Sequence, residues 1–279
     1  MTPSGIVTLV TDFGLSDTYV GEMHAVLLAR NPGITVIDVS HGVPFGSLDS
    51  TLYLTERAWP AFPPGTVHLV VVDPGVGGDR RLVAIASEGN FYIGPDTGVL
   101  SSGLPDALRP RDAIRTVALL AAVTAVEISN STFRREPVSS TFHGRDLIAP
   151  VGAALAASTP IAETGAFIAA VRAAPPLHAT LNDGQGTGRI MHIDSFGNAI
   201  TNFRTADASP TFLIEVGDAG AATSVKSYTS GPPDHPVALG GSGGYIEIAW
   251  PRGNAADRLG LHAGTPVRIR PVSARSWPR

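Results

Sequence analysis

The sequence predicts two domains, an N-terminal α/β domain and a smaller all-β domain. Three observations support this prediction. Apolar strand-like runs alternate with helical spacing over residues 1–175, and a stretch rich in proline and glycine, APPLHATLNDGQGTG, follows. Beyond this stretch only short strand-like runs occur. We therefore expect domains at 1–175 and 185–279, joined by a linker at 176–184.

The first domain begins with IVTLV at residues 6–10, whose β-branched side chains favour a strand. TYVGEMHAVLLARNP then has helical spacing and ends at Pro32. ITVIDVS at 34–40 predicts a second strand, and SLDSTLYLTERAWPAF predicts a helix that begins at a Ser47 cap. TVHLVVVD at 66–73 predicts a third strand. Strands this continuously apolar indicate a sheet that is covered on both faces.

The remaining elements follow from the same patterns. RLVAIASEGNFYIGPDTGVLS resembles a hairpin, GRDLIAPVGAALAAST predicts a helix, and ETGAFIAAV predicts another short element. The second domain contains the runs GRIMHIDSFGNAITNF, TFLIEVG, TSVKSYTS, GYIEIAW and TPVRIRPV. Short strands separated by turns indicate a small barrel or sandwich.

Composition excludes several classes of function. Hydrophobic residues make up 43% of the 279 residues and charged residues 16%, so the chain can bury a sizeable core. A net charge of −4 gives no electrostatic reason to bind nucleic acid or an anionic membrane. Lys226 is the only lysine, which excludes the Gly-Lys-Ser/Thr motif of P-loop proteins. Cysteine is absent, which excludes disulfides, thiolate nucleophiles and cysteine-bound zinc.

No targeting signal is evident in the sequence. The start, MTPSGIVTLVTDFG, lacks the basic and apolar regions of a signal peptide. The most apolar tract, TVALLAAVTAVEI from Thr116, is too short to span a bilayer. We therefore expect a cytoplasmic protein.

Two aspartates follow the first strand in TDFGLSD. Asp12 lies at the carboxyl end of the strand and Asp17 at the start of the next helix. Ligands of α/β sheets bind outside such strand ends, where a carboxylate can accept two ribose hydroxyls. Equally, Asp17 could cap the helix and Asp12 could only complete a turn.

Asp73 ends another strand and is followed by PGVGG and then by Arg80. Glycine lets a backbone approach a ligand closely, and seven residues allow Arg80 to return to Asp73 after a tight turn. The two could also form a surface ion pair of little energetic value. His143, in STFHGRD, lies in a polar loop before a predicted helix, where functional sites concentrate. The other histidines show no metal-ligand spacing such as HExxH.

In the second domain, HIDSFGNAITN brings Asp194, Phe196, Asn198 and Asn202 close together in sequence. An aromatic ring next to an amide can stack on a purine and form hydrogen bonds with it. SFGN also suits a turn between strands. GGSGGYIEIAWPRGNAA adds a glycine-rich backbone and the pair Asn254-Ala255.

Taken in order, several stretches resemble one family. They are VTLVTDFGLSDTYVGEMHAVL, ITVIDVSHGVP, FPPGTVHLVVVDPGVGGDRRLVAI, FYIGPDTGVLS, PVSSTFHGRDLIAPVGAALA, HIDSFGNAITN and GYIEIAWPRGNAA. The family is the S-adenosyl-L-methionine (SAM) hydroxide adenosyltransferases, or SAM hydrolases, which are relatives of the SAM-dependent fluorinase and chlorinase. The resemblance implies an N-terminal mixed α/β sandwich domain and a small C-terminal β-barrel. It also implies a homotrimer with active sites between the N-terminal domain of one subunit and the C-terminal domain of its neighbour.

The resemblance also implies residue roles in a reaction of SAM with water that gives adenosine and L-methionine. The catalytic set of the family falls on Asp73, Arg80 and His143, and the ribose-binding aspartate falls on Asp12. Contacts with the methionine moiety fall on Asp194 and Ser242, contacts with adenine on Phe196, Asn198, Asn254 and Ala255, and further substrate contacts on Phe45, Thr141 and Phe142.

These residue types suit the implied chemistry. Water must displace methionine from the 5′ carbon of the ribose, which requires a positioned oxygen and an acceptor for its proton. Asp73 and His143 could each accept that proton, while Arg80 fixes the carboxylate. Methionine leaves neutral from a sulfonium, so we expect neither a metal nor an organic cofactor, and SAM is the substrate.

Three alternatives compete with hydrolysis. In a related halogenase a halide replaces water, but Asp73 would repel the anion and Gly144 lacks the hydroxyl that a Tyr-Ser pair supplies in those relatives. A non-catalytic SAM or adenosine sensor would have no use for a group that activates water. A metal hydrolase could be built on Asp12, Asp17, Asp38 and His41.

Overall fold

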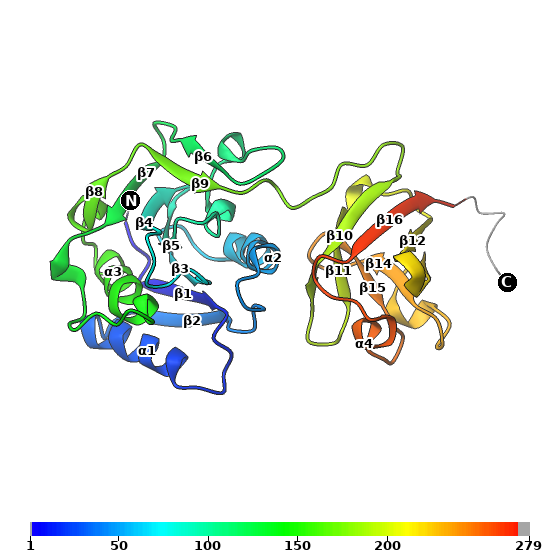
Figure 1. Ribbon diagram of the computed structural model, residues 1–279, viewed down its shortest axis with the longest axis horizontal. Helices are drawn as coiled ribbons and strands as arrows, with labels where there is room; N and C mark the ends of the chain where they lie inside the picture. Colours follow the sequence, from blue (N-terminus) through cyan, green and yellow to red (C-terminus); the bar gives the residue numbers. More distant parts are fainter. Residues whose placement is uncertain (1, 273–279) are drawn as a thin grey trace. The chain divides into compact units, whose positions relative to one another are not determined.

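The computed structural model describes residues 2–272 (Figure 1). Its contacts divide the chain into two compact units, with the boundary between Pro176 and Leu177. The first unit is a mixed α/β domain and the second is a closed barrel, so the predicted fold class is confirmed.

The first unit is built on one sheet of seven strands. Their order across the sheet is β2 (Thr35–Ser40), β1 (Ile6–Thr11), β3 (Val67–Val71), β5 (Asn90–Pro95), β4 (Leu82–Ser87), β7 (Thr124–Ile128) and β8 (Gly165–Phe167). β2, β1, β3 and β5 are parallel to one another, whereas β4, β7 and β8 join antiparallel. The loops that follow β1, β2 and β3 therefore leave from the same edge of the sheet.

Both faces of this sheet are covered, as the unbroken apolar strands predict. On one face, α1 (Tyr19–Arg30) packs beside α3 (Ala149–Ala156), and Leu9 of β1 and Leu69 of β3 point into their core. On the other face lie α2 (Leu48–Ala58) and a small sheet of β6 (Arg115–Ala118) and β9 (Ala170–Ala173). Val10 and Val70, the next residues along their strands, point there because side chains alternate along a strand.

Some local predictions are confirmed and others are wrong. The Ser47 cap of α2 is confirmed, since Ser47 Oγ accepts a hydrogen bond from Ser50 N at 3.3 Å. Thr18, not Asp17, is the N-cap residue of α1, so the interpretation of Asp17 as a cap is wrong. The helix predicted in GRDLIAPVGAALAAST begins with a π-helical turn at Gly144–Ile148 before α3.

The second unit is a closed barrel of seven strands. Around the barrel these are β10 (Gly186–Ile193), β11 (Ala199–Arg204), β15 (Tyr245–Ala249), β14 (Val237–Gly240), β13 (Ala221–Ser224), β12 (Phe212–Glu215) and β16 (Pro266–Pro271). Pairing of β10 with both β11 and β16 closes the ring. Phe203 and Ile246 are fully buried in its core, and the short helix α4 (Ala255–Leu259) follows β15. Among residues 2–272, no helix has the length and apolar character needed to cross a bilayer.

Candidate active site

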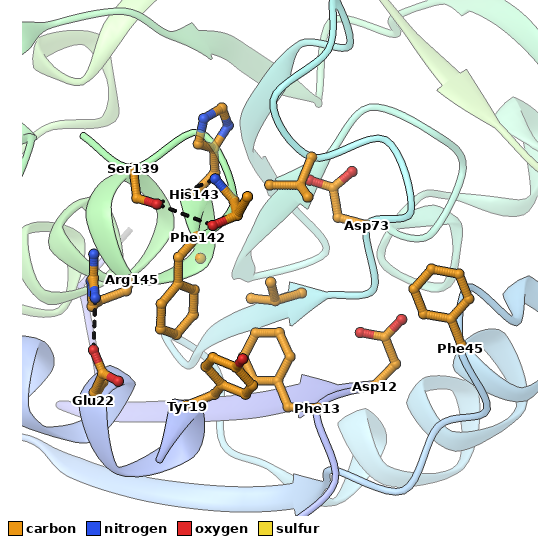
Figure 2. Close-up of a pocket in the computed structure, with 14 residues that line it drawn as sticks. Asp12, Phe13, Tyr19, Glu22, Phe45, Asp73, Ser139, Phe142, His143 and Arg145 are labelled. Carbon is orange, nitrogen blue, oxygen red and sulfur yellow. Dashed lines mark hydrogen bonds and ion pairs between the residues drawn. The ribbon is translucent and has the colours of Figure 1, made fainter. Parts of the chain in front are cut away.

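A cavity of about 460 Å³ lies in the first unit, where loops leave the carboxyl ends of β1, β2 and β3 (Figure 2). Six of the residues chosen from the sequence line it: Asp12, Phe45, Asp73, Thr141, Phe142 and His143. They come from three loops and from the segment before α3. The topology therefore gathers side chains that lie far apart in the sequence.

Asp73, Arg80 and His143 form one hydrogen-bonded group. Arg80 Nε donates to both carboxylate oxygens of Asp73, at 3.0 and 2.9 Å, and Arg80 Nη2 lies 2.8 Å from His143 Nδ1. The Asp73 side chain is 4% exposed and that of Arg80 is 12% exposed. The alternative of a weak surface ion pair is therefore wrong. Arg80 is not part of the cavity lining, whereas its two partners are.

The contact with Arg80 fixes the proton arrangement of His143. A guanidinium only donates hydrogen bonds, so His143 Nδ1 must be the acceptor. A neutral His143 then carries its proton on Nε2. Burial, with a further contribution from the charge of Arg80, lowers the pKa of His143 below its ordinary value of 6.5. The imidazole is therefore neutral at neutral pH.

Two glycines allow the loops of this group to meet. Gly77 has φ +79°, and a Cβ there would lie 2.4 Å from the carbonyl oxygen of Ser140. The loop after Asp73 thus packs directly on the segment before His143. At Gly144 a Cβ would lie 2.8 Å from Val71 Cγ1, so the absence of a side chain lets His143 approach β3.

Asp12 is the second carboxylate of the cavity. Its Oδ2 accepts a hydrogen bond from Gly46 N at 2.9 Å. Burial raises the pKa of Asp12, the Gly46 hydrogen bond opposes this effect, and the nearby charge of Asp73 adds to it. Asp12, Glu22 and Asp73 line the cavity together with the guanidinium of Arg145, and this excess of carboxylates favours a cationic ligand. Phe45, next to Gly46, is 83% exposed at the cavity rim.

On the opposite wall of the cavity, sequence reasoning found Phe142 but missed Phe13, Tyr19, Glu22 and Arg145. Phe13, Tyr19 and Phe142 pack edge-to-face or tilted, with ring centroids 5.3–5.7 Å apart. Arg145 lies over Phe142 at 4.8 Å and donates to Glu22 Oε2 at 2.7 Å. The motifs TDFG and HGRD contain Phe13 and Arg145, so these motifs were the sequence signal that could have identified the wall.

Five of the six binding residues predicted in the second domain cluster within the barrel unit. Asp194 Oδ1 accepts hydrogen bonds from the backbone amides of Phe196 and Asn198, at 2.9 and 2.8 Å, so SFGN does form a turn between β10 and β11. Ala256 N donates to the carbonyl of Gly197 in this turn, which places Asn254 and Ala255 beside it. The Phe196 ring is 76% exposed. Ser242 does not join them: it lies in the turn between β14 and β15, which meets Thr205 just after the end of β11, whereas the Asp194 turn precedes the start of that strand.

The four residues of the metal-hydrolase alternative do not form a ligand set. Within residues 2–272, no group of three or more His, Asp and Glu side chains is arranged to hold a metal ion. Asp38 instead contacts two imidazoles, with its Oδ1 2.8 Å from His24 Nε2 and 3.1 Å from His41 Nε2. That alternative therefore has no geometric support in this part of the chain.

Comparison with known proteins places the chain in a family. The profile of the SAM hydroxide adenosyltransferase N-terminal domain matches residues 7–165, and that of the C-terminal domain matches residues 188–268. The chain belongs to the SAM hydroxide adenosyltransferase family. A (R)-S-adenosyl-L-methionine hydrolase of Thermus thermophilus is 36% identical, over 94% of this chain and 98% of that protein. A fluorinase of Actinoplanes sp. is 27% identical over 72% of each chain.

Solved structures agree with this placement. The crystal structure of an uncharacterized conserved protein from Thermotoga maritima has a TM-score of 0.80 and 27% identity, and covers 95% of this chain and 99% of that one. The similarity to that structure thus extends over both units of this fold. The resemblance noted from the motifs VVDPGVG and STFHGRD is confirmed.

Proposed function

We propose that this protein hydrolyses SAM to adenosine and L-methionine. The observation that carries the proposal is the Asp73–Arg80–His143 group, two members of which line a cavity that also contains Asp12. The family membership and the SAM hydrolase of Thermus thermophilus support the same substrate. A cavity lined by three carboxylates and one guanidinium suits a substrate whose sulfonium is positively charged.

In this mechanism a water molecule attacks the 5′ carbon of the ribose in line with the departing sulfur. The oxygen–carbon bond forms as the carbon–sulfur bond breaks, and the electron pair of the broken bond neutralises the sulfonium. The water gives up one proton to a base. Holding the oxygen in attacking geometry contributes roughly 7–11 kcal/mol in the best intramolecular cases.

We assign the base to Asp73. His143 Nδ1 is occupied by Arg80 and its Nε2 carries a proton, so the neutral ring can donate to the water but has no free lone pair for it. Arg80 donates twice to Oδ2 of Asp73 but only once to Oδ1, so Oδ1 keeps a lone pair for the water. Asp73 therefore accepts the proton, His143 orients the oxygen, and Arg80 holds both groups in place.

The halogenase alternative uses the same fold with a halide as nucleophile. A negatively charged Asp73, which lines the cavity, opposes binding of an anion there. Gly144 offers no hydroxyl to hold a halide. The sensor alternative leaves the Asp73–Arg80–His143 group without a purpose.

One experiment separates these functions. The purified protein is incubated with SAM, with and without chloride and a chelator, and the nucleoside is identified by mass spectrometry. We expect adenosine under every condition. A 5′-halogenated nucleoside would establish the halogenase, and unchanged SAM would establish the sensor. Loss of activity with chelator would contradict our proposal that the reaction needs no metal or other cofactor.

We further propose that the barrel unit binds the rest of the substrate. Phe196, Asn198 and the Asn254-Ala255 backbone contact adenine, and Asp194 and Ser242 contact the methionine moiety. The exposed ring of Phe196 beside the Asn254-Ala255 segment supports a stacking role. We also propose a cytoplasmic homotrimer in which the barrel of one subunit completes the cavity of its neighbour.

A further inference from the structure

Behind the loop that carries Asp12, a chain of hydrogen bonds fixes the backbone. Phe13 N donates to Thr11 Oγ1 at 3.3 Å, and Gly14 N donates to the carbonyl of His41 at 2.8 Å. Thr11 Oγ1 in turn lies 2.9 Å from His41 Nδ1. Thr11 is fully buried and His41 is 5% exposed. Both amides that follow Asp12 are thus held by one Thr–His pair.

The series of contacts that begins at Phe13 N ends at the carboxylate of Asp38. His41 Nε2 lies 3.1 Å from Asp38 Oδ1, a close electrostatic contact rather than a well-directed hydrogen bond. His24 of α1 donates to the same oxygen at 2.8 Å. Burial raises the pKa of Asp38, but its contacts with these two imidazoles outweigh that effect and lower the pKa overall. Asp38 therefore remains charged.

The charge of Asp38 decides which group donates and which accepts in each of these hydrogen bonds. A carboxylate beside Nε2 keeps the imidazole proton on Nε2, so Nδ1 of His41 accepts from the Thr11 hydroxyl. With its proton committed to His41, Thr11 Oγ1 presents a lone pair to Phe13 N–H. Phe13 N–H thus donates to Thr11, and the Thr11 hydroxyl donates to His41; hydrogen bonds linked in this way strengthen one another.

We propose that Thr11, His41 and Asp38 form a positioning unit that orients the Asp12 carboxylate toward the ribose of the substrate, and so sets affinity rather than the rate of the chemical step. This inference rests on the proposed function. Only one hydrogen bond from outside its own residue, that of Gly46 N, holds the Asp12 side chain within residues 2–272. Gly46 lies on the loop that begins at His41, so His41 anchors both segments around Asp12. Ribose contacts persist from ground state to transition state, so their loss raises KM and leaves kcat nearly unchanged.

The same strand supplies a matched control. Thr8 Oγ1 lies 2.8 Å from His68 Nδ1, both residues are fully buried, and neither lines the cavity. Thr8→Val therefore removes the same kind of buried hydrogen bond three residues before Thr11. Any effect of losing a Thr–His contact on stability alone appears in both variants.

The test compares Thr11→Val, Thr11→Ser and Thr8→Val in steady-state kinetics with SAM and in calorimetric binding of adenosine. We expect Thr11→Val to raise KM and the adenosine Kd about three- to tenfold, with kcat within about twofold, as loss of one hydrogen bond suggests. Thr11→Ser should restore both constants, and Thr8→Val should lower only the melting temperature. A KM shift in Thr11→Val no larger than in Thr8→Val would overturn the proposal.

Two further measurements test the role of Asp38 and separate this inference from the proposed function. Asp38→Asn changes a partly exposed side chain, so it should fold, and it should also raise KM because the proton on His41 is no longer held in place. An unchanged KM in a folded Asp38→Asn would remove Asp38 from the unit. If the wild-type protein binds adenosine but leaves SAM intact, the proposed hydrolysis is refuted. The positioning unit is then still tested by the adenosine Kd of the variants. If it binds neither, both proposals fall.

Discussion

Arg80 donates hydrogen bonds to Asp73 and His143 at once, so two groups that line the cavity are held by a third that does not line it. One long side chain therefore sets the distance between the carboxylate and the imidazole. Its planar guanidinium fits this task because several N–H groups point in fixed directions, which a lysine ammonium cannot reproduce.

Replacing the proposed base tests this arrangement most directly. Asp73→Asn should lower kcat by about 10²–10⁴-fold, the usual contribution of general base catalysis, while the Kd for SAM changes only a few-fold. Single-turnover kinetics and calorimetry measure the two effects. Asp96→Asn is the control, because Asp96 pairs with Arg81 at a buried position outside the cavity. Full turnover by Asp73→Asn would remove Asp73 from the mechanism.

The pH dependence of kcat follows from His143. Burial and the charge of Arg80 lower its pKa, so the ring stays neutral as pH falls through 6.5 and gains a proton only in more acidic solution. Protonation at Nδ1 would break the contact with Arg80. We expect kcat to stay level between pH 8 and 6.5 and to decline below that range. An acidic limb centred at or above pH 6.5 would contradict the assigned state of His143.

At the scale of elements, the cavity depends on the contact between the loop after β3 and the segment before α3. Gly77→Ala should destabilise the protein by about 1–3 kcal/mol, because it combines a positive φ with a clash against Ser140. It should also lower activity, since the Asp73 loop must move. Gly264→Ala has a similar φ of +90° but no neighbour within 4 Å, so it isolates the effect of φ. Equal activity in the two variants would show that the contact does not position Asp73.

Strand β3 also carries a stability determinant that depends on pH. His68 stacks on Trp59 and on Tyr92, at centroid distances of 4.9 and 5.3 Å, in a cluster in which those two rings also contact each other, and burial lowers the pKa of His68 to about 3. Between pH 6.5 and 3 the unfolded chain therefore binds a proton at His68 that the folded protein does not. The free energy of unfolding should fall by about 1.4 kcal/mol per pH unit, or about 5 kcal/mol in total.

Urea unfolding at pH 7 and pH 4 measures this loss. A His68→Phe variant lacks the titrating group, so its free energy of unfolding should depend less steeply on pH than that of the wild type. If both proteins lost stability equally on acidification, His68 would not be the group responsible.

For the whole molecule, the proposed trimer can be tested by mixing inactive variants. Asp73→Asn impairs the first unit and Phe196→Ala impairs the barrel. If active sites form between subunits, mixed trimers contain some sites with neither change. We expect activity to return after the two variants are unfolded and refolded together, and light scattering to report three subunits. A monomer, or no recovery, would refute the shared site.

The extent of sequence-based prediction differs from one part of the molecule to another. β1, β2 and β3 are rich in β-branched residues, so the sheet edge that carries Asp12 and Asp73 was predictable. β6 and β7 were missed because no glycine or proline interrupts TVALLAAVTAVEI between them. The Glu22–Arg145 wall was missed because it joins residues 123 positions apart, a distance that local periodicity cannot bridge.

The crowding around Gly144 constrains how this hydrolase lineage could acquire halide chemistry. A serine at position 144 would supply the missing hydroxyl, but its Cβ would collide with the stiff Val71 side chain and crowd the Met23 sulfur. A serine at this position therefore needs a compensating change in its surroundings, and the smaller side chain of Val71→Ala would supply the room.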